Sequence, residues 1–122
     1  MSVYSSTKTA ELNSCLKSLA EQHLKSDQIV VVRDGPVQPC VEECIENYAS
    51  YLPFEHLYFP ENRGLGYALH DGLEACENEI VARVDSDDTS VPQRFISQLD
   101  YLVNNPAISV IGGWMTEHYL HT

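Results

Sequence analysis

The sequence predicts an α/β fold in which a mostly parallel, doubly wound sheet carries helices on both faces. Segments with strand-like and helix-like spacing of apolar residues alternate along the chain. The strand-like segments, such as "IVVV" at residues 29–32, are apolar at consecutive positions, as is typical of strands buried on both faces. Strands of that kind, joined by helices, form a parallel sheet that is covered on both sides.

Length and charge restrict the possibilities further. The chain has 122 residues, 43% of them hydrophobic, so residues 1–122 are expected to form a single domain around one core. The formal net charge of −11 argues against nucleic acid, and against an anionic membrane surface, as non-specific partners. An anionic ligand would need a cation beside it. No apolar run approaches the roughly 20 residues that a transmembrane helix needs.

The cysteines indicate a reducing environment. There are four of them, none forms a CxxC pair, and no signal peptide is recognisable. A reduced, cytoplasmic setting is therefore expected rather than a disulfide framework.

The predicted helices follow from apolar residues spaced by three and four positions. Pro39 and Pro92 stand where the second and the last helix are expected to begin, because proline suits the first helical turn. The glycines of the third helix suit close packing. The apolar positions are, in chain order, Leu12, Cys15, Leu16 and Leu19; Val41, Cys44, Ile45 and Tyr48; Leu65, Ala68, Leu69, Gly72, Leu73 and Cys76; and Phe95, Leu99 and Leu102.

The predicted strands lie between these helices and are bounded by turn-forming residues. They are "QIVVVR" at residues 28–33, "FEHLYF" at 54–59, "EIVARV" at 79–84 and "AISVIGG" at 107–113. In such sheets, ligands bind beyond the carboxyl ends of the strands. Residues 34–36, 62–66 and 85–88 follow these ends and are expected to line the site.

The acidic loop at residues 85–88, "DSDD", is the most unusual of the three. Three carboxylates at the end of a buried strand repel one another, which requires an explanation. Mg²⁺ and Mn²⁺ take hard oxygen ligands, usually one or two carboxylates together with substrate phosphates. The loop therefore predicts a divalent ion that bridges the protein and a diphosphate.

Two structural interpretations of this loop compete with the metal site. Thr89 or Ser90 can cap the helix that Pro92 begins, but a cap explains neither the number nor the position of the acids. A calcium-binding EF-hand loop fails, because Ser90 stands where its glycine belongs and Ile96 where its bidentate glutamate belongs.

A third interpretation is catalytic. The pattern DxDxT after a hydrophobic strand looks like the nucleophile motif of haloacid dehalogenase-type phosphatases, with Asp85 as nucleophile and Asp87 as acid/base. In that family the motif lies on the opening strand, with a lysine downstream. Here three strand–helix units precede it, and no Lys or Arg follows Arg94. The phosphatase interpretation is therefore disfavoured.

Six segments of the chain follow one another in a recognisable order. They are "VYSS", "ELNSCLKSLAEQ", "VVVRDGP", "NRGLGYALHDGLEAC", "VARVDSDDTSVPQRFISQLDYL" and "ISVIGG". The most specific parts are the paired patterns "NxGLGxAL" and "RxDxDDxSxPxR". Together the segments, which cover nearly the whole chain, resemble a family 2 glycosyltransferase with the GT-A fold. The resemblance implies transfer of a sugar from a nucleotide-sugar donor to an acceptor hydroxyl, with inversion and with Mn²⁺ or Mg²⁺.

The resemblance also implies roles for single residues. Tyr4 would lie against the nucleotide base, and Asp34 would contact the base or the ribose. The glycine loop would run beside the diphosphate, where Arg63 would either pair with phosphate or be solvated. Arg83 is expected in an ion pair with a nearby acid. The implied nucleotide-sugar-binding residues are Ser2, Tyr4, Asp34, Asn62, Gly64, Gly66, Asp85 and Asp87, and the implied metal ligands are Asp87 and Asp88.

Two departures from the family pattern matter. "MSVY" supplies only the tail of a first strand, and the acceptor-binding half with its general base is expected beyond Thr122. The chain is therefore interpreted as the donor-binding part of a longer enzyme, which by itself binds nucleotide but transfers sugar poorly. The alternative is a nucleotide-binding or assembly module without transfer activity.

The expected partners follow from the resemblance as well. The donor would be a UDP-, GDP- or dTDP-sugar, and the acceptor a saccharide or a lipid-linked saccharide in polysaccharide biosynthesis. The full-length protein would be cytoplasmic or peripheral at the inner face of a membrane.

Overall fold

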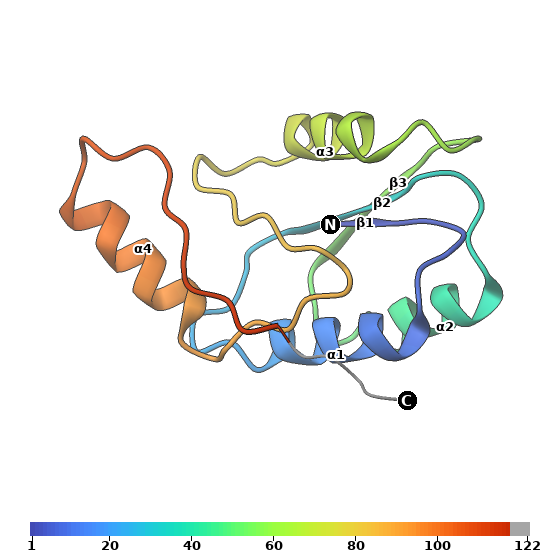
Figure 1. Ribbon diagram of the computed structural model, residues 1–122, viewed down its shortest axis with the longest axis horizontal. Coiled ribbons are helices and arrows are strands. Elements are labelled where there is room, and N and C mark those ends of the chain that lie inside the picture. The colour runs from blue at the N-terminus through green and yellow to red at the C-terminus, as the bar shows by residue number, and fades with distance from the viewer. Residues whose placement is uncertain (118–122) are drawn as a thin grey trace.

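The computed structural model describes residues 1–117 and has three layers, with a parallel sheet between two layers of helices (Figure 1). Helices α1 (Thr9–Ala20) and α2 (Pro39–Asn47) cover one face, and α3 (Leu65–Glu74) covers the other. The predicted α/β class with helices on both faces is confirmed. Within residues 1–117, no helix is long and apolar enough to cross a membrane.

The sheet aligns the ends of its strands. Among the described residues it has three strands, in the order β1 (Ser2–Val3), β2 (Ile29–Arg33) and β3 (Phe54–Tyr58), all parallel. Val3 pairs with Arg33, and Arg33 pairs with Tyr58. The segments that leave the three strands therefore start side by side at one edge.

Strand β2 supplies both cores, because its side chains alternate between the two faces of the sheet. Val31 joins the larger core under α1 and α2, whereas Val30 and Val32 pack with Ala68 of α3. A Cβ at Gly72 would lie 3.1 Å from Val32 Cγ2. The close packing that was expected of the glycines in α3 is confirmed at this position.

The end of β2 is anchored by a buried charge. Arg33 is only 4% exposed, and its guanidinium donates two hydrogen bonds to the carboxylate of Glu42 and lies 2.7 Å from His56 Nδ1. The hydrogen bonds from Arg33 lower the pKa of Glu42. This network fixes the strand directly before Asp34.

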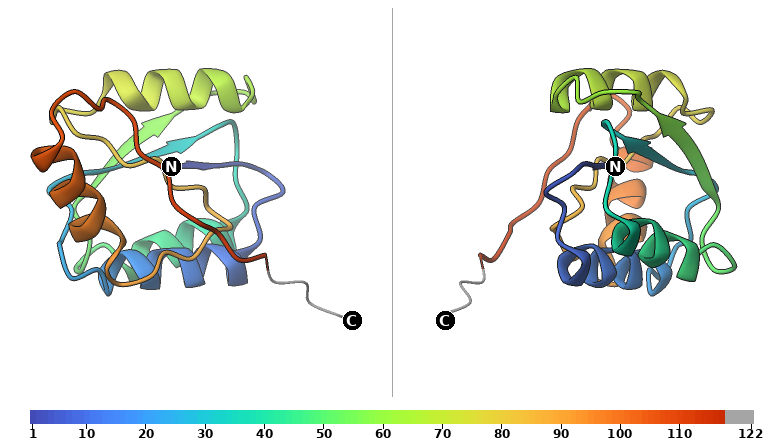
Figure 2. Two further views of the ribbon diagram at one scale, coloured as in Figure 1. Left: turned by 60° about the vertical axis from the view of Figure 1, so that its left-hand side comes forward. Right: turned by 90° about the vertical axis from the view of Figure 1, so that its right-hand side faces the viewer.

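Two predicted strands are absent from the described residues. Residues 80–84 run without ladder pairing, and only Val84 is buried, while Ile80 and Val81 are exposed. Strand β1 has only two residues, so its free edge offers few backbone groups to a neighbour. Residues 107–113 also form no strand and pass along the outside of the fold (Figure 2).

The last helix differs from its prediction at the start. Helix α4 (Arg94–Asn104) begins two residues after Pro92, and its N-cap residue is Gln93, whose side chain makes no capping hydrogen bond. The expectation that Thr89 or Ser90 caps this helix is therefore wrong. Pro92 lies in the turn before α4, and Ser90 is buried against α1 instead.

The four cysteines are all free thiols, as expected, and each lies in the described part of the chain.

Candidate functional site

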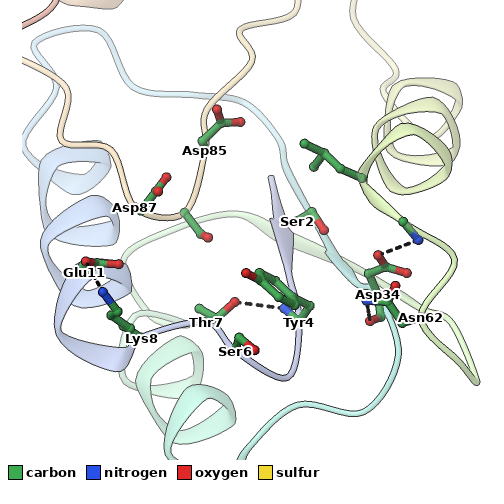
Figure 3. A pocket seen from close by; sticks show the side chains of 13 residues that line it. Ser2, Tyr4, Ser6, Thr7, Lys8, Glu11, Asp34, Asn62, Asp85 and Asp87 are labelled. Atoms are coloured by element: carbon green, nitrogen blue, oxygen red, sulfur yellow. Dashed lines mark hydrogen bonds and ion pairs between the residues drawn. The ribbon is translucent and has the colours of Figure 1, made fainter.

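A cavity of about 560 Å³ opens at the carboxyl edge of the sheet. Figure 3 shows side chains from β1, from the start of α1, from the ends of β2 and β3 and from the acidic loop around it. Its lining residues are Ser2, Tyr4, Ser6, Thr7, Lys8, Glu11, Asp34, Asn62, Gly64, Leu65, Asp85, Ser86 and Asp87.

Tyr4 presents an aromatic ring to the cavity. The turn after β1 fixes its backbone, because the Tyr4 N–H donates to Thr7 Oγ1 at 2.9 Å and the Thr7 N–H donates to the Tyr4 carbonyl at 3.1 Å. Tyr4 is 45% exposed. An exposed ring on a fixed backbone can stack against a planar ligand.

Asp34 joins two walls of the cavity. Asp34 is 4% exposed, and its carboxylate accepts backbone hydrogen bonds from Arg63 at 2.7 Å and from Gly64 at 3.0 Å. The Asn62 side-chain amide donates to the Asp34 carbonyl at 3.2 Å. The loop after β3 is therefore held directly against the end of β2.

Gly35 makes this contact possible. Its φ is +84°, a conformation that favours glycine. A Cβ at this position would lie 2.7 Å from the Asn62 backbone nitrogen, which is closer than two such atoms can pack. The Asp34–Gly35 turn and the loop at residues 61–64 consequently form one rigid wall.

The Arg63 side chain does not line the cavity and contacts other residues instead. Its guanidinium pairs with Asp71 at 3.1 Å and lies 4.8 Å and 4.6 Å from the ring centres of Phe59 and Tyr67. Between the two roles that the sequence left open for Arg63, these contacts favour a surface arginine over a phosphate ligand.

The acidic loop is a tight turn with crowded charge. The Asp88 N–H donates to the Asp85 carbonyl at 3.1 Å. Arg83 pairs with the Asp85 carboxylate at 3.2 Å, which confirms the predicted ion pair. Although Asp88 is exposed, partial desolvation of its carboxyl group raises its pKa, and the negative charges of Asp87 and Asp85 raise it further.

The loop is anchored by α1 instead of by a sheet partner. Ser90 N–H donates to Ser18 Oγ at 3.0 Å, and the Gln22 side chain donates to the Val91 carbonyl at 2.7 Å and accepts from the Phe95 N–H. Arg94 holds the other side, donating to the Arg83 carbonyl and to Ser90 Oγ.

Cys15 of α1 touches the acidic loop as well. Its Sγ lies 3.5 Å from the Asp85 carbonyl oxygen. Burial raises the pKa of Cys15 to about 12, so the thiol stays protonated and can donate.

The chemistry of the donor set fits a hard divalent cation. Asp87 and Asp88 are exposed carboxylates, and such oxygens suit Mg²⁺ or Mn²⁺. No group of three or more His, Cys, Asp or Glu side chains within residues 1–117 could hold a metal ion alone. Substrate oxygens would have to complete the coordination shell.

The cavity gathers most of the predicted site residues. Ser2, Tyr4, Asp34, Asn62, Gly64, Asp85 and Asp87 line it together. Two predicted residues are not among the described lining residues: Gly66 lies in the first turn of α3, and Asp88 lies beyond the lining part of the acidic turn. Thr122, beyond which the general base is expected, lies outside the described residues.

Sequence reasoning missed the contribution of the segment that enters α1. Ser6, Thr7, Lys8 and Glu11 line the cavity, although their types and spacing match no chemical motif. It also missed the anchors Ser18 and Gln22, for which a signal exists. Both follow Cys15 at helical spacing, so they are polar residues on an otherwise apolar face.

The fold is that of the GT-A glycosyltransferases. S. aureus TarS superimposes with a TM-score of 0.74 at 25% sequence identity, over 84% of this chain and 18% of that chain. The structure of S. aureus TarS 1-349 in complex with UDP gives the same TM-score at 22% identity, over 86% of this chain and 32% of that one.

The chain belongs to glycosyl transferase family 2. The model of this family matches residues 1–119. The amylovoran biosynthesis glycosyltransferase AmsE of Erwinia amylovora is 38% identical over 121 residues, which are 99% of this chain and 46% of that protein. An Escherichia coli enzyme named UDP-Gal:alpha-D-GlcNAc-diphosphoundecaprenol beta-1,3-galactosyltransferase is 30% identical over 117 residues, 96% of this chain and 42% of that protein.

The chain thus spans less than half the length of these two relatives. The family match favours the glycosyltransferase interpretation over the DxDxT phosphatase.

Proposed function

We propose that this chain forms the donor-binding part of a metal-dependent, inverting glycosyltransferase that uses a nucleotide-sugar. The observation that carries the proposal is the cavity, which places an exposed tyrosine ring and a rigid glycine loop opposite the acidic turn. A nucleotide-sugar has the corresponding parts: a planar base, a ribose and a charged diphosphate. One relative is named for a UDP-Gal donor, and the TarS structure holds UDP.

In this proposal Tyr4 stacks on the base, with Ser2 beside it. Asp34 holds the loop at residues 62–64 in place, and its remaining acceptor sites receive a base N–H or a ribose hydroxyl. Gly64 and its neighbours let the backbone approach the nucleotide closely.

Asp87 and Asp88 would hold Mn²⁺ or Mg²⁺, while Asp85 shapes the turn through its pair with Arg83. The ion, when bound, offsets the repulsion between an acidic loop and a diphosphate and stabilises the charge on the departing nucleotide. The carboxylates of the loop position the diphosphate end of the donor.

Transfer also requires a base that takes the proton from the acceptor hydroxyl as it attacks the anomeric carbon. We place this base, and the binding site for a saccharide or lipid-linked saccharide acceptor, in the part of the longer relatives that this chain does not span. We expect the 122-residue chain to bind nucleotide and to transfer sugar poorly.

Calorimetric titration of the protein with UDP, GDP and dTDP, each with and without Mn²⁺, tests the proposal. We expect one nucleotide to bind, and to bind at least about tenfold more tightly with the ion, because the ion screens the acidic loop. Failure of all three nucleotides to bind would contradict a donor site in this chain. Binding that ignores Mn²⁺ would contradict the metal dependence alone.

A further inference from the structure

Lys8 stands out in the charge balance of the cavity. It is the one basic side chain among the described lining residues, against four acidic ones, which are Glu11, Asp34, Asp85 and Asp87. The basic residues nearest in sequence to the other walls, Arg33, Arg63 and Arg83, are paired with Glu42, Asp71 and Asp85. Among the described lining residues, an anionic ligand in this cavity therefore meets a single basic side chain.

The ammonium of Lys8 is loosely held. Its Nζ lies 3.3 Å from Glu11 Oε1, and the two side chains are 75% and 41% exposed. Exposed pairs of this kind contribute only about 0–1 kcal/mol. The Lys8 backbone, in contrast, is fixed, because its carbonyl accepts from the Leu12 N–H at 3.0 Å as α1 begins. Lys8 thus has a fixed backbone and a side chain that is free to change partner.

The location of Lys8 suggests that partner. In Figure 3, Asp34 and Asn62 lie at one end of the cavity, and Lys8 and Glu11 lie toward the end where Asp87 projects. If the nucleotide base occupies the end of the cavity at Tyr4 and Asp34, the diphosphate reaches the end at Asp87. A lysine ammonium carries three donors and no acceptor, so it suits phosphate oxygens better than a base or a hydroxyl.

We propose that Lys8 binds the diphosphate of the nucleotide donor, and that Glu11 competes with the diphosphate for the Lys8 ammonium. The proposal rests on the donor-binding function proposed above. In this proposal Lys8 supplies a second positive charge beside the divalent ion, and Glu11 lowers the affinity for the donor by pairing with the Lys8 ammonium.

The two residues should act in opposite directions. We expect Lys8→Ala to weaken binding of the nucleoside diphosphate about tenfold, the value of one charge-assisted contact to phosphate. Lys8→Arg should keep most of the affinity, because the charge remains. Glu11→Gln should tighten binding about two- to threefold, because it removes the competitor for the ammonium. None of these changes should alter binding of the matching nucleoside by more than about twofold.

Calorimetry measures these effects on the protein with Mn²⁺ present throughout. The probes are whichever of UDP, GDP and dTDP binds most tightly, and its nucleoside. Lys17→Ala is the matched control, because Lys17 also lies in α1 in an exposed pair, with Glu21 at 3.9 Å, but does not line the cavity. Thermal unfolding of each variant checks that the fold is intact.

The outcomes separate the two proposals. Unchanged diphosphate affinity in Lys8→Ala would overturn the role of Lys8 and leave the donor site standing. An equal loss for nucleoside and diphosphate would also overturn it, because Lys8 would then act on the nucleoside or on the fold. Absence of binding by every nucleotide to the unchanged protein would overturn the donor site and, with it, the role of Lys8.

Discussion

At the scale of single residues, Asp34 carries more of the site than its sequence context indicates. An Asp-Gly pair after a strand predicts a turn, and the family resemblance adds a ligand contact. Neither indicates that the two carboxylate oxygens accept the backbone N–H groups of Arg63 and Gly64, about thirty residues away in the chain. A carboxylate has about four lone-pair sites, so this clamp, formed by the two backbone hydrogen bonds to Asp34, leaves acceptor sites for a ligand.

The clamp predicts the effect of Asp34→Asn. The asparagine keeps one acceptor oxygen but turns an NH₂ group toward a backbone N–H that loses its partner. Because the site is buried, we expect the free energy of unfolding to fall by about 1–3 kcal/mol. Amide hydrogen exchange should accelerate at Arg63 or Gly64, and nucleotide affinity should fall with it.

Asp71→Asn is the comparison for this variant. Asp71 is an acid of α3 that also contacts Arg63, but through a partly exposed ion pair, so its loss should cost less than about 1 kcal/mol. Chemical denaturation measures both variants. Equal stabilities for Asp34→Asn and the unchanged protein would contradict the clamp.

At the scale of elements, the sequence predicts the site better than the sheet. The loops after β2 and β3 meet at the cavity as predicted, because consecutive apolar runs make parallel strands whose carboxyl ends align. Residues 80–84 have the same apolar character and form no strand. The apolar pattern of a segment indicates that it can be buried. Strand pairing also requires a neighbouring strand with a long enough free edge, and β1 has only two residues.

Helix α1 replaces that missing pairing and so positions the acidic loop. Gln22 is 1% exposed and bonds to the Ser18 carbonyl, the Val91 carbonyl and the Phe95 N–H. It therefore ties the end of α1 to both the loop exit and the start of α4. A buried glutamine with all its partners within the protein is a polar contact that apolar periodicity alone does not predict.

Gln22→Ala tests this anchoring. Removal of the side chain takes a hydrogen-bond partner from the buried Ser18 carbonyl and from the Phe95 N–H and opens a cavity, while the Val91 carbonyl keeps the Arg94 N–H. We therefore expect a loss of about 2–4 kcal/mol in the free energy of unfolding. The adjacent Glu21→Ala, on the exposed side of α1, should change stability by less than about 1 kcal/mol. Denaturant unfolding compares the two, and similar midpoints would show that the loop does not depend on Gln22.

At the scale of the whole molecule, the net negative charge and the arrangement of the cavity both affect the binding of an anionic ligand. A net charge of −11 is unfavourable for binding an anionic diphosphate, yet the cavity puts one lysine and an acidic turn where the diphosphate would lie. The alternation of helices and strands predicts this three-layer arrangement well. The entry into α1, with Ser6, Thr7, Lys8 and Glu11, could not be predicted as part of the cavity, because only the three-dimensional turn after β1 brings it there.

Helix α4 belongs to the same scale. None of its residues, all of them described, is buried, and Ile96, Tyr101 and Val103 are exposed. Its start is held by hydrogen bonds from Gln22 and Arg94 and by Phe95, which packs against the larger core. The sheet edge, the start of α1 and the acidic turn line the cavity, and no residue of α4 does.

The most direct test of the central claim uses the paramagnetism of Mn²⁺. In amide-resolved NMR spectra of the protein with the bound nucleotide, trace Mn²⁺ should first broaden the signals of residues 85–88, and then those of Lys8 and Glu11. Signals of α2, which carries Glu42, Glu43 and Glu46, should remain sharp, and Mg²⁺ should shift the same site signals without broadening them. Broadening that is centred on α2 or spread evenly over the acidic surface would contradict a metal-dependent donor site at the acidic loop.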